Sequence, residues 1–298
     1  MTTPVELDDY QHELGGVLIG TGTAVQIRTI EGLGLAPVRT GDVEPDGEDG
    51  TWLGIDRYGG RTVRIDAAVK VVGDAGGVLD RIADLVEAAD DEDVRGHGGT
   101  TMDLRLKFPG RPVRVLRGRI RKAEPELDQV IHGYAPLDIE FQTADHLYYA
   151  DEPGTTSIPL GLISSGGLSF PLAFPLTIEG DPQAVGRPSF LQVEGTAATW
   201  PVLRVTGPCA NPTITHVASG RSLTVQATLA AGEWVEIDTR PGWRTVLREN
   251  GGGVPLAGTS RVDEFRLTPG LNEIRWTATD PTLTSTLAVT WWPAYKAL

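Results

Sequence analysis

The fold of the second half of this 298-residue chain follows from one short stretch, Ala231-Gly232-Glu233-Trp234-Val235-Glu236-Ile237-Asp238-Thr239. After the Ala-Gly turn, apolar and polar side chains alternate, which is typical of a strand with one buried face and one face in water. Similar segments lie at 202–206, 214–217, 222–225, 244–247, 265–267, 272–276 and 285–291, separated by turns rich in Gly, Pro and Asn. About eight short strands without a helical pattern predict a β-sandwich of jelly-roll or galectin type.

The first half combines strands with one helix. Alternating or apolar runs predict strands at 25–30, 63–71, 102–108, 113–121 and 137–142, and the turn Pro109-Gly110-Arg111-Pro112 predicts a hairpin between the third and fourth. Apolar side chains at helical spacing between Val78 and Ala89 predict an amphipathic helix. The glycine-rich residues 15–22 and the acidic residues 40–50 are interpreted as loops, the second of them mobile.

A change of composition near residue 155 predicts two domains, 1–155 and 156–298. The first carries 29 acids against 16 bases and the second 11 against 10, while six of the seven tryptophans lie in the second. The predicted fold class is therefore mainly β: an α+β N-terminal domain with one helix, and a C-terminal β-sandwich.

The composition excludes several classes of protein. With a net charge of −14, the chain lacks the basic surface of a general nucleic-acid binder. A single cysteine, Cys209, excludes an intrachain disulfide and a cysteine-based zinc site. No apolar run is long enough for a membrane helix, and the first residues lack the pattern of a secretory signal. We therefore expect no membrane insertion.

Charges of opposite sign are clustered along the first half, and this predicts a contact between copies of the chain. If the basic cluster of one copy meets the acidic cluster of the next, the contact is head-to-tail and can close into a ring. The alternative is two solvated faces. The candidate interface residues are the bases Arg105, Lys107, Arg114, Arg117, Arg119 and Arg121 and the acids Asp80, Asp84, Asp90, Asp91, Glu92 and Asp93.

Residues with catalytic or metal-binding spacing are scarce, so we expect no enzyme, no cofactor and no metal site. None of the five histidines has the spacing of a metal ligand. Two alternatives stay open. The first is a carbohydrate-binding module whose sugar platform contains Trp234, Trp243, Trp291 and Trp292. The second is a glycan-degrading enzyme that uses Glu236 or Asp238, which requires a second carboxylate across a cleft.

The second half resembles the C-terminal domain of siphophage distal tail proteins. The resemblance rests on segments in a fixed order: 166–175, 195–214, the G-E-x-x-x-I-D-T motif of 232–239 and the L-x-P-G-x-N-x-I motif of 267–274. The first half is similar through its β-rich layout with one helix and through residues 143–149, where the family usually reads A-D-P-x-x-Y. Here His146 replaces the proline.

The resemblance implies a structural virion protein. Members of this family form a hexameric ring at the distal end of a long non-contractile tail, between the tail tube protein and the tail-tip hub protein. Their C-terminal galectin-like domains carry other tip components or receptor-binding proteins, and DNA passes the lumen without specific binding. The family brings no catalytic residues. For this chain the resemblance implies synthesis in the host cytoplasm, and we expect residues 40–50 to become ordered against a neighbouring ring.

Overall fold

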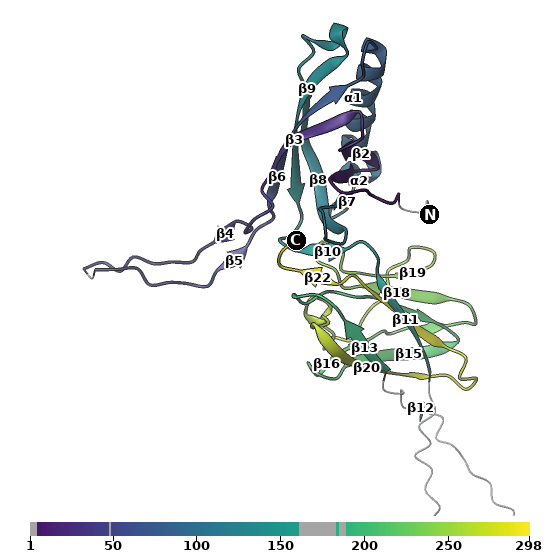
Figure 1. Ribbon diagram of the computed structural model, residues 1–298. Helices are drawn as coiled ribbons and strands as arrows, with labels where there is room; N and C mark the ends of the chain where they lie inside the picture. The colour runs from purple at the N-terminus through teal and green to yellow at the C-terminus, as the bar shows by residue number, and fades with distance from the viewer. Residues whose placement is uncertain (1–4, 48, 161–182, 185–188) are drawn as a thin grey trace, which may run out of the picture. The chain divides into compact units, whose positions relative to one another are not determined.

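The computed structural model describes residues 5–47, 49–160, 183–184 and 189–298. The chain forms two compact units, shown in Figure 1. Unit 1 contains Met1–Asp151 and Tyr295–Leu298, and unit 2 contains Glu152–Ala294. Each unit has its own buried hydrophobic core. The division lies next to the turn at 151–155 where the composition changes. None of the helices in the described residues is long and apolar enough to cross a membrane.

Unit 1 is built on a curved antiparallel sheet with the strand order β2-β1-β7-β8-β9-β6-β3. The strand β10 pairs with β8 beside this path. The elements of the sheet are β1 (Gln11–Leu14), β2 (Val17–Gly20), β3 (Val25–Glu31), β6 (Thr62–Lys70), β7 (Met102–Leu106), β8 (Arg114–Pro125), β9 (Tyr134–Thr143) and β10 (Tyr148–Ala150), with the 3-10 turn η1 (Val130–His132) between β8 and β9. The predicted strands and the hairpin at Pro109–Pro112 are confirmed.

One helix of four turns packs on the sheet. The helix α1 (Ala75–Ala89) begins at Asp74, whose carboxylate accepts a hydrogen bond from the backbone amide of Gly77 at 2.9 Å. Its side chains Val78, Ile82 and Leu85 are buried against the sheet, so the predicted helix is confirmed. The sequence pattern did not predict the single helical turn α2 (Glu92–Gly96) that follows.

The glycine-rich residues 15–22 form most of a hairpin rather than a loop. The strands β1 and β2 pair from Leu14 and Val17 outward. Gly15 and Gly16 at the turn have φ of 56° and 89°. This left-handed conformation suits a two-residue hairpin turn and is costly for other residues. The prediction of a loop was wrong because the glycines occupy the turn itself, while Leu14 and Ile19 are buried in the core.

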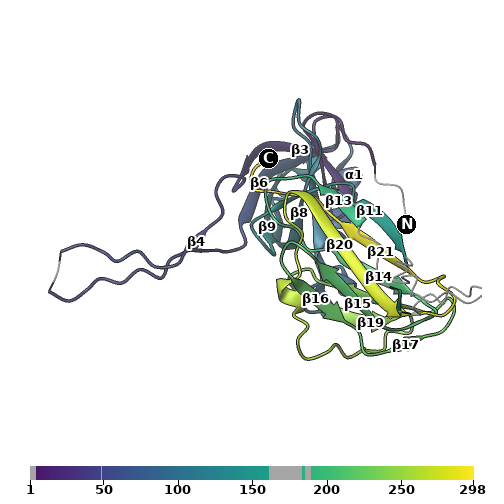
Figure 2. The same ribbon diagram turned by 90° about the horizontal axis from the view of Figure 1, so that it is seen from below.

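Unit 2 consists of two antiparallel sheets that enclose one core, as Figure 2 shows. One sheet has the order β11-β21-β14-β18-β19, and the other has β12-β20-β15-β16, with β13 paired to β20 and β17 paired to β15. The strands are β11 (Gly154–Pro159), β12 (Gln183–Ala184), β13 (Ser189–Val193), β14 (Val202–Thr206), β15 (Cys209–His216), β16 (Arg221–Thr224), β17 (Thr228–Leu229), β18 (Trp234–Asp238), β19 (Thr245–Arg248), β20 (Gly270–Thr279), β21 (Thr286–Trp291) and, at the boundary of the units, β22 (Ala294–Tyr295). The prediction of a mainly β chain is confirmed.

One predicted strand of unit 2 is wrong. Residues 265–267 follow the 3-10 turn η2 (Val262–Glu264), and Leu267 makes a single bridge with Thr199 instead of a strand ladder. Phe265 and Leu267 are fully buried. The alternation of Phe265, Arg266 and Leu267 therefore comes from a loop that buries two apolar side chains, and not from a strand. The quoted segment 166–175 lies outside the described residues.

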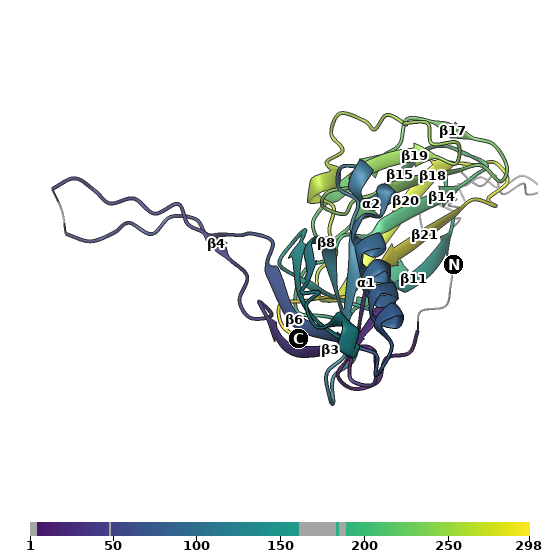
Figure 3. The ribbon, with the colours of Figure 1, turned by 90° about the horizontal axis from the view of Figure 1, so that it is seen from above.

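A long two-stranded arm extends from unit 1 between β3 and β6, on the side away from α1 (Figures 1 and 3). It contains β4 (Val38–Arg39) paired with β5 (Arg57–Tyr58). Farther out, the backbones of Val43 and Trp52 exchange two hydrogen bonds of 3.0 and 2.9 Å. The predicted mobile loop 40–50 is thus the outer part of this arm.

Candidate interaction surfaces

The sheet face of unit 1 that points away from α1 carries a ladder of ion pairs. Val63 and Ile65 point into the core, so the intervening charged side chains of β6 point outward. Pairs between neighbouring strands are Arg28–Asp66, Arg64–Glu140 at 3.2 Å, Lys122–Asp138 at 2.8 Å and Arg117–Asp103 at 3.9 Å. These four bases are therefore paired with acids of the same unit.

Arg105, the first base of the predicted ring interface, is bound inside its own chain. Its side chain donates hydrogen bonds to both carboxylate oxygens of Asp151 at 2.7 and 2.6 Å, to Glu13 and to the carbonyl of Val5. The residue is 7% exposed. The hydrogen bonds that Arg105 donates to Asp151 contribute most to raising the pKa of Arg105. Arg105 thus joins Glu13 of β1 to Asp151, and its charge is neutralised within its own chain.

The remaining bases of the predicted interface differ in their environments. Most are half-buried and bind groups of unit 1: Lys107 the carbonyl of Arg111, Arg114 the ring of Tyr295, Arg117 the ring of Tyr149, and Arg119 the carbonyls of Thr100 and His97. Within the described residues, Arg121 is the one base of this set that is exposed and has no partner. It stands at the bulge where β8 slips its register against β9.

The predicted acids lie on or next to the two helices. Asp80 and Asp84 belong to α1, and Asp84 pairs with Arg81 at 2.8 Å. Asp90 pairs with Arg95 at 2.8 Å. The carboxylate of Asp91 caps the start of α2, and Glu92 and Asp93 follow in its first turn, where the helix dipole favours negative charge. The structure therefore places the acids on or between the two helices and the bases on β7 and β8 or directly after β7. A contact between the two sets in neighbouring copies stays a prediction.

The base of the arm is fixed by a buried arginine. Arg61 is 2% exposed and donates to the carbonyl of Gly34 at 2.8 Å and to the hydroxyl of Tyr148 at 2.6 Å. The Tyr148 hydroxyl in turn donates to the carbonyl of Leu33. His146 stacks on the ring of Tyr58 in β5, with ring centres 4.8 Å apart. His146 thus contacts the second strand of the arm.

The outer arm exposes large apolar side chains. Trp52, Leu53 and Ile55 are 65%, 85% and 77% exposed, and Val43 is 56% exposed. A hairpin with so few backbone pairs is only marginally stable alone in water. Contiguous exposed apolar groups of this kind mark interaction surfaces. These exposed side chains were not predicted from the sequence, because the acids and glycines that indicate a loop end at residue 50 and the apolar run follows them.

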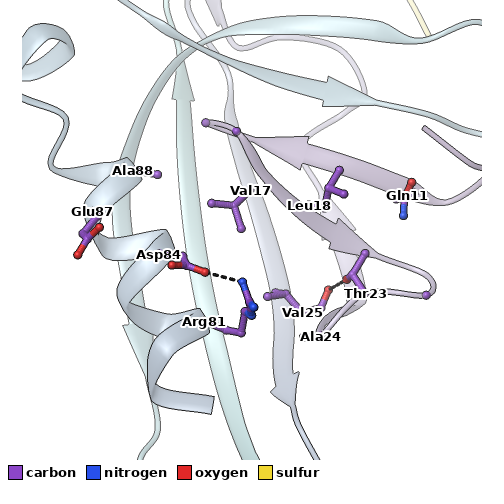
Figure 4. A pocket seen from close by; sticks show the side chains of 13 residues that line it. Gln11, Val17, Leu18, Thr23, Ala24, Val25, Arg81, Asp84, Glu87 and Ala88 are labelled. Carbon is purple, nitrogen blue, oxygen red and sulfur yellow. Dashed lines mark hydrogen bonds and ion pairs between the residues drawn. The ribbon is translucent and has the colours of Figure 1, made fainter. Parts of the chain in front are cut away.

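An open cleft of about 780 Å³ lies between α1 and the strands β2 and β3. Figure 4 shows Arg81, Asp84, Glu87 and Ala88 of α1 on one side and residues of β2 and β3 on the other. The apolar part of the lining comes from Val17, Leu18, Ala24, Val25 and Ala88. Arg81 crosses toward the strands and is held by Asp84. The lining of the cleft is thus part apolar and part polar: Arg81 pairs with Asp84 along α1, and Glu87 adds a second acid.

The motif at 267–274 of unit 2 has a structural role. Asn272 is fully buried, its amide donates to the carbonyls of Thr268 and Gly270 at 2.7 and 3.0 Å, and its oxygen accepts from the Thr268 amide at 2.9 Å. The same oxygen lies 3.1 Å from Nε2 of His216. Burial lowers the pKa of His216. Asn272 therefore fixes the turn that starts β20.

The tryptophans and acids behind the two alternative functions are engaged within unit 2. Trp291 is buried in the core. The guanidinium of Arg240 lies between Trp243 and Trp292, 5.3 and 5.1 Å from the ring centres, and Arg204 lies over Trp234 at 4.2 Å. Glu236 pairs with Arg204 and Asp238 with Arg240, each at 2.6 Å. In the described part of the chain, no group of three or more His, Cys, Asp or Glu residues could hold a metal ion. Nothing in this geometry favours sugar binding or hydrolysis.

Three comparisons with known proteins add to this geometry. Residues 194–295 match the model of the family described as siphovirus-type tail component, C-terminal domain. The SPP1 Dit protein, whose structure is described as a paradigm of the hub adsorption apparatus in phages that infect Gram-positive bacteria, matches with a TM-score of 0.58 and 17% identity over 94% of this chain and 97% of its own. Two structures of the phage P2 baseplate in its activated conformation, with Ca and with Sr, each match with a TM-score of 0.52 and 10% identity over 90% of this chain and 97% of theirs. The search of curated proteins found no match.

Proposed function

We propose that this chain forms a hexameric ring at the distal end of a long non-contractile phage tail. The proposal is supported by its similarity to siphophage distal tail proteins in both family model and fold. The ring joins the tail tube to the tip hub and carries peripheral adsorption components. Unit 1 forms the ring, and unit 2 projects as a galectin-like domain. The chain is made in the host cytoplasm and resides in the virion. The proposal includes no catalytic, cofactor or metal site, and DNA passes the lumen without specific binding.

The observation that carries the proposal is the agreement of two separate similarities. The family model covers most of unit 2, and the fold similarity covers nearly the whole chain. The apolar arm supports the proposal further, because a chain that acts alone has no use for such an exposed segment. A structural part of a multi-subunit assembly requires surfaces of this kind.

The proposal is tested by the mass of the purified full chain. Mass photometry and light scattering over a range of concentrations and salt should find a species near six times the 31.9 kDa monomer. A cryo-electron microscopy class average of that species should show sixfold symmetry. A chain that stays at monomer mass under every condition, or that forms only dimers, would contradict the ring.

A further inference from the structure

The hairpin turn between β15 and β16 of unit 2 joins a serine, a histidine and an asparagine in one hydrogen-bonded chain. Ser219 is exposed in the turn, and its Oγ lies 2.8 Å from Nδ1 of His216, the last residue of β15. Nε2 of His216 lies 3.1 Å from Oδ1 of Asn272 on β20. A hydroxyl in contact with a base that a third group orients is the arrangement found at nucleophilic serines.

The hydrogen bonds of Asn272 determine the tautomer of His216. The Asn272 amide nitrogen donates to two backbone carbonyls, and its oxygen accepts from the Thr268 amide, so the oxygen is the atom that faces the imidazole. An amide oxygen accepts and cannot donate, so Nε2 of His216 must carry the hydrogen. Nδ1 of the neutral ring is then an acceptor without a hydrogen. The imidazole therefore presents its basic nitrogen to the hydroxyl of Ser219.

The Ser219 hydroxyl has one hydrogen to donate, and the distances decide where it goes. The carbonyl oxygen of His216 and the amide nitrogen of Arg221 are both 3.4 Å from Oγ, at the limit of a hydrogen bond, whereas Nδ1 is 2.8 Å away. His216 is 1% exposed, and burial lowers its pKa, so the ring is neutral at neutral pH. A neutral imidazole that accepts the serine proton activates the hydroxyl as a nucleophile.

The turn around Ser219 is accessible to a large substrate. Residues 217–220 are all exposed. Within the described residues, the backbone amides of Ala218 and Ser219 bind no acceptor. Free amides beside an attacking oxygen stabilise the negative charge that develops on a substrate carbonyl. On the inner side, the ring centre of Phe265 lies 6.2 Å from that of His216. The nucleophile therefore faces water, while the base behind it is shielded.

We propose that Ser219 is a nucleophile that takes an acyl group from a carboxylic ester, with His216 as its base and Asn272 as the residue that positions the base. Oγ bonds to the ester carbonyl carbon while its proton moves to Nδ1 of His216. The bond from that carbon to the alkoxy oxygen then breaks with its electron pair on the oxygen, which takes the proton from His216 and leaves as an alcohol. Water hydrolyses the acyl-serine to a carboxylic acid and free Ser219. The site does not depend on the proposed ring.

Labelling of the full chain with a fluorophosphonate tests the proposal. The probe forms a phosphorus–oxygen bond with an activated serine and releases fluoride. Peptide mass spectrometry compares Ser219 with the matched control Ser157, an exposed serine of β11, a strand that contains no histidine. In the folded chain Ser219 should react roughly 100-fold faster, which is the contribution of a positioned general base. In concentrated urea the two serines should react at the same rate.

Two variants assign the reaction to these residues. Ser219→Ala should remove the label from its peptide. His216→Gln should lower the labelling rate of Ser219 roughly 100-fold, because glutamine supplies no base. Urea titration followed by tryptophan fluorescence shows whether each variant is folded. If His216→Gln does not fold, the comparison of Ser219 with Ser157 in the wild-type chain decides.

The positioning role of Asn272 has a readout that a purely structural role would not move. In Asn272→Asp the carboxylate faces Nε2 and raises the pKa of His216, so the rise of the labelling rate with pH should shift to higher pH. Equal labelling of Ser219 and Ser157 in the folded wild-type chain overturns the proposal, as does undiminished labelling in a folded His216→Gln variant. An unshifted pH profile in a folded Asn272→Asp variant overturns the role of Asn272. None of these results changes the expected mass of the ring.

Discussion

Replacing Arg105 by alanine should destabilise unit 1 and not merely weaken a contact between copies. Its guanidinium binds Asp151 through two hydrogen bonds and also binds Glu13, in a site that is 7% exposed. Removal of one partner from a buried ion pair costs about 3–5 kcal/mol, because the other charge is left without compensation. The side chains of Glu13 and Asp151 are 19% and 23% exposed, so water can partly solvate the stranded carboxylates. The loss should therefore lie near the lower end, at about 3 kcal/mol.

The measurement must report on unit 1 alone, because a chain of two units need not unfold in a single step. Hydrogen exchange of the amides in β7 and β8 does this. A loss of about 3 kcal/mol should speed the exchange of the slowest amides roughly 100-fold. The matched control is Arg121→Ala, which removes an exposed arginine from the same sheet and should change the free energy of unfolding by no more than about 0.5 kcal/mol.

A double variant completes the test. Asp151→Asn removes one of the two charges that Arg105→Ala strands, so the combined loss should be smaller than the sum of the single losses. If Arg105→Ala and Arg121→Ala exchange at the same rate, the network contributes nothing to the stability of unit 1. That result would refute the reasoning and return Arg105 to the set of interface candidates.

Two further predictions concern other parts of the chain. Asn272→Ala should lower the free energy of unfolding of unit 2 by about 2–4 kcal/mol, because several buried polar groups lose their partner. Urea titrations followed by tryptophan fluorescence measure this loss. Asn250→Ala, at a surface turn, is the control, and equal losses in the two variants would contradict the role of Asn272. Burial lowers the pKa of His12 to about 4, whereas its value in the unfolded chain is 6.5. As the pH falls from 7 to 4, the unfolded state therefore binds a proton more readily than the folded state. The free energy of unfolding of unit 1 should fall by about 3 kcal/mol over this range. A His12→Gln variant should lose less over that range by hydrogen exchange, and an equal loss would exclude His12 as the cause.

Periodicity predicted the regular elements because burial on one face imposes it. The helix at 75–89 and the strand pair β7 and β8 fall where the apolar spacing places them. The same spacing did not reveal which apolar side chains of the helix would be covered. Leu79 and Val86 belong to the predicted stripe, yet they are 48% and 45% exposed, because the sheet contacts only one side of the stripe. The spacing of apolar residues along a helix does not show how much of the helix surface the sheet will cover.

The candidate site was harder to predict because a sequence does not show which partner each charged side chain binds. The basic run from Arg105 to Lys122 was interpreted as a face that meets either solvent or the acids of a neighbouring copy, but ion pairs connect several of its side chains to residues far along the chain, such as Glu13, Asp138 and Asp151. Those partners depend on the sheet order, which the sequence alone does not contain. The arm was missed for a different reason. Its Trp-Leu-Gly-Ile run looks like an ordinary strand until the structure shows that nothing covers it.

The net charge of the chain determines whether salt stabilises or destabilises the proposed ring. Each copy carries −14, and six copies in one ring repel one another. If paired acidic and basic patches closed the ring, salt would weaken it, because salt screens attraction beyond a Debye length of about 8 Å at physiological ionic strength. In the structure Arg105, Lys107 and Arg117 are already paired with acids of their own unit, so half of these bases are neutralised without a neighbour. Salt then screens mainly repulsion, and the hexamer should become more stable between low and high salt. Dissociation at high salt would instead restore the charged patches as the contact that closes the ring.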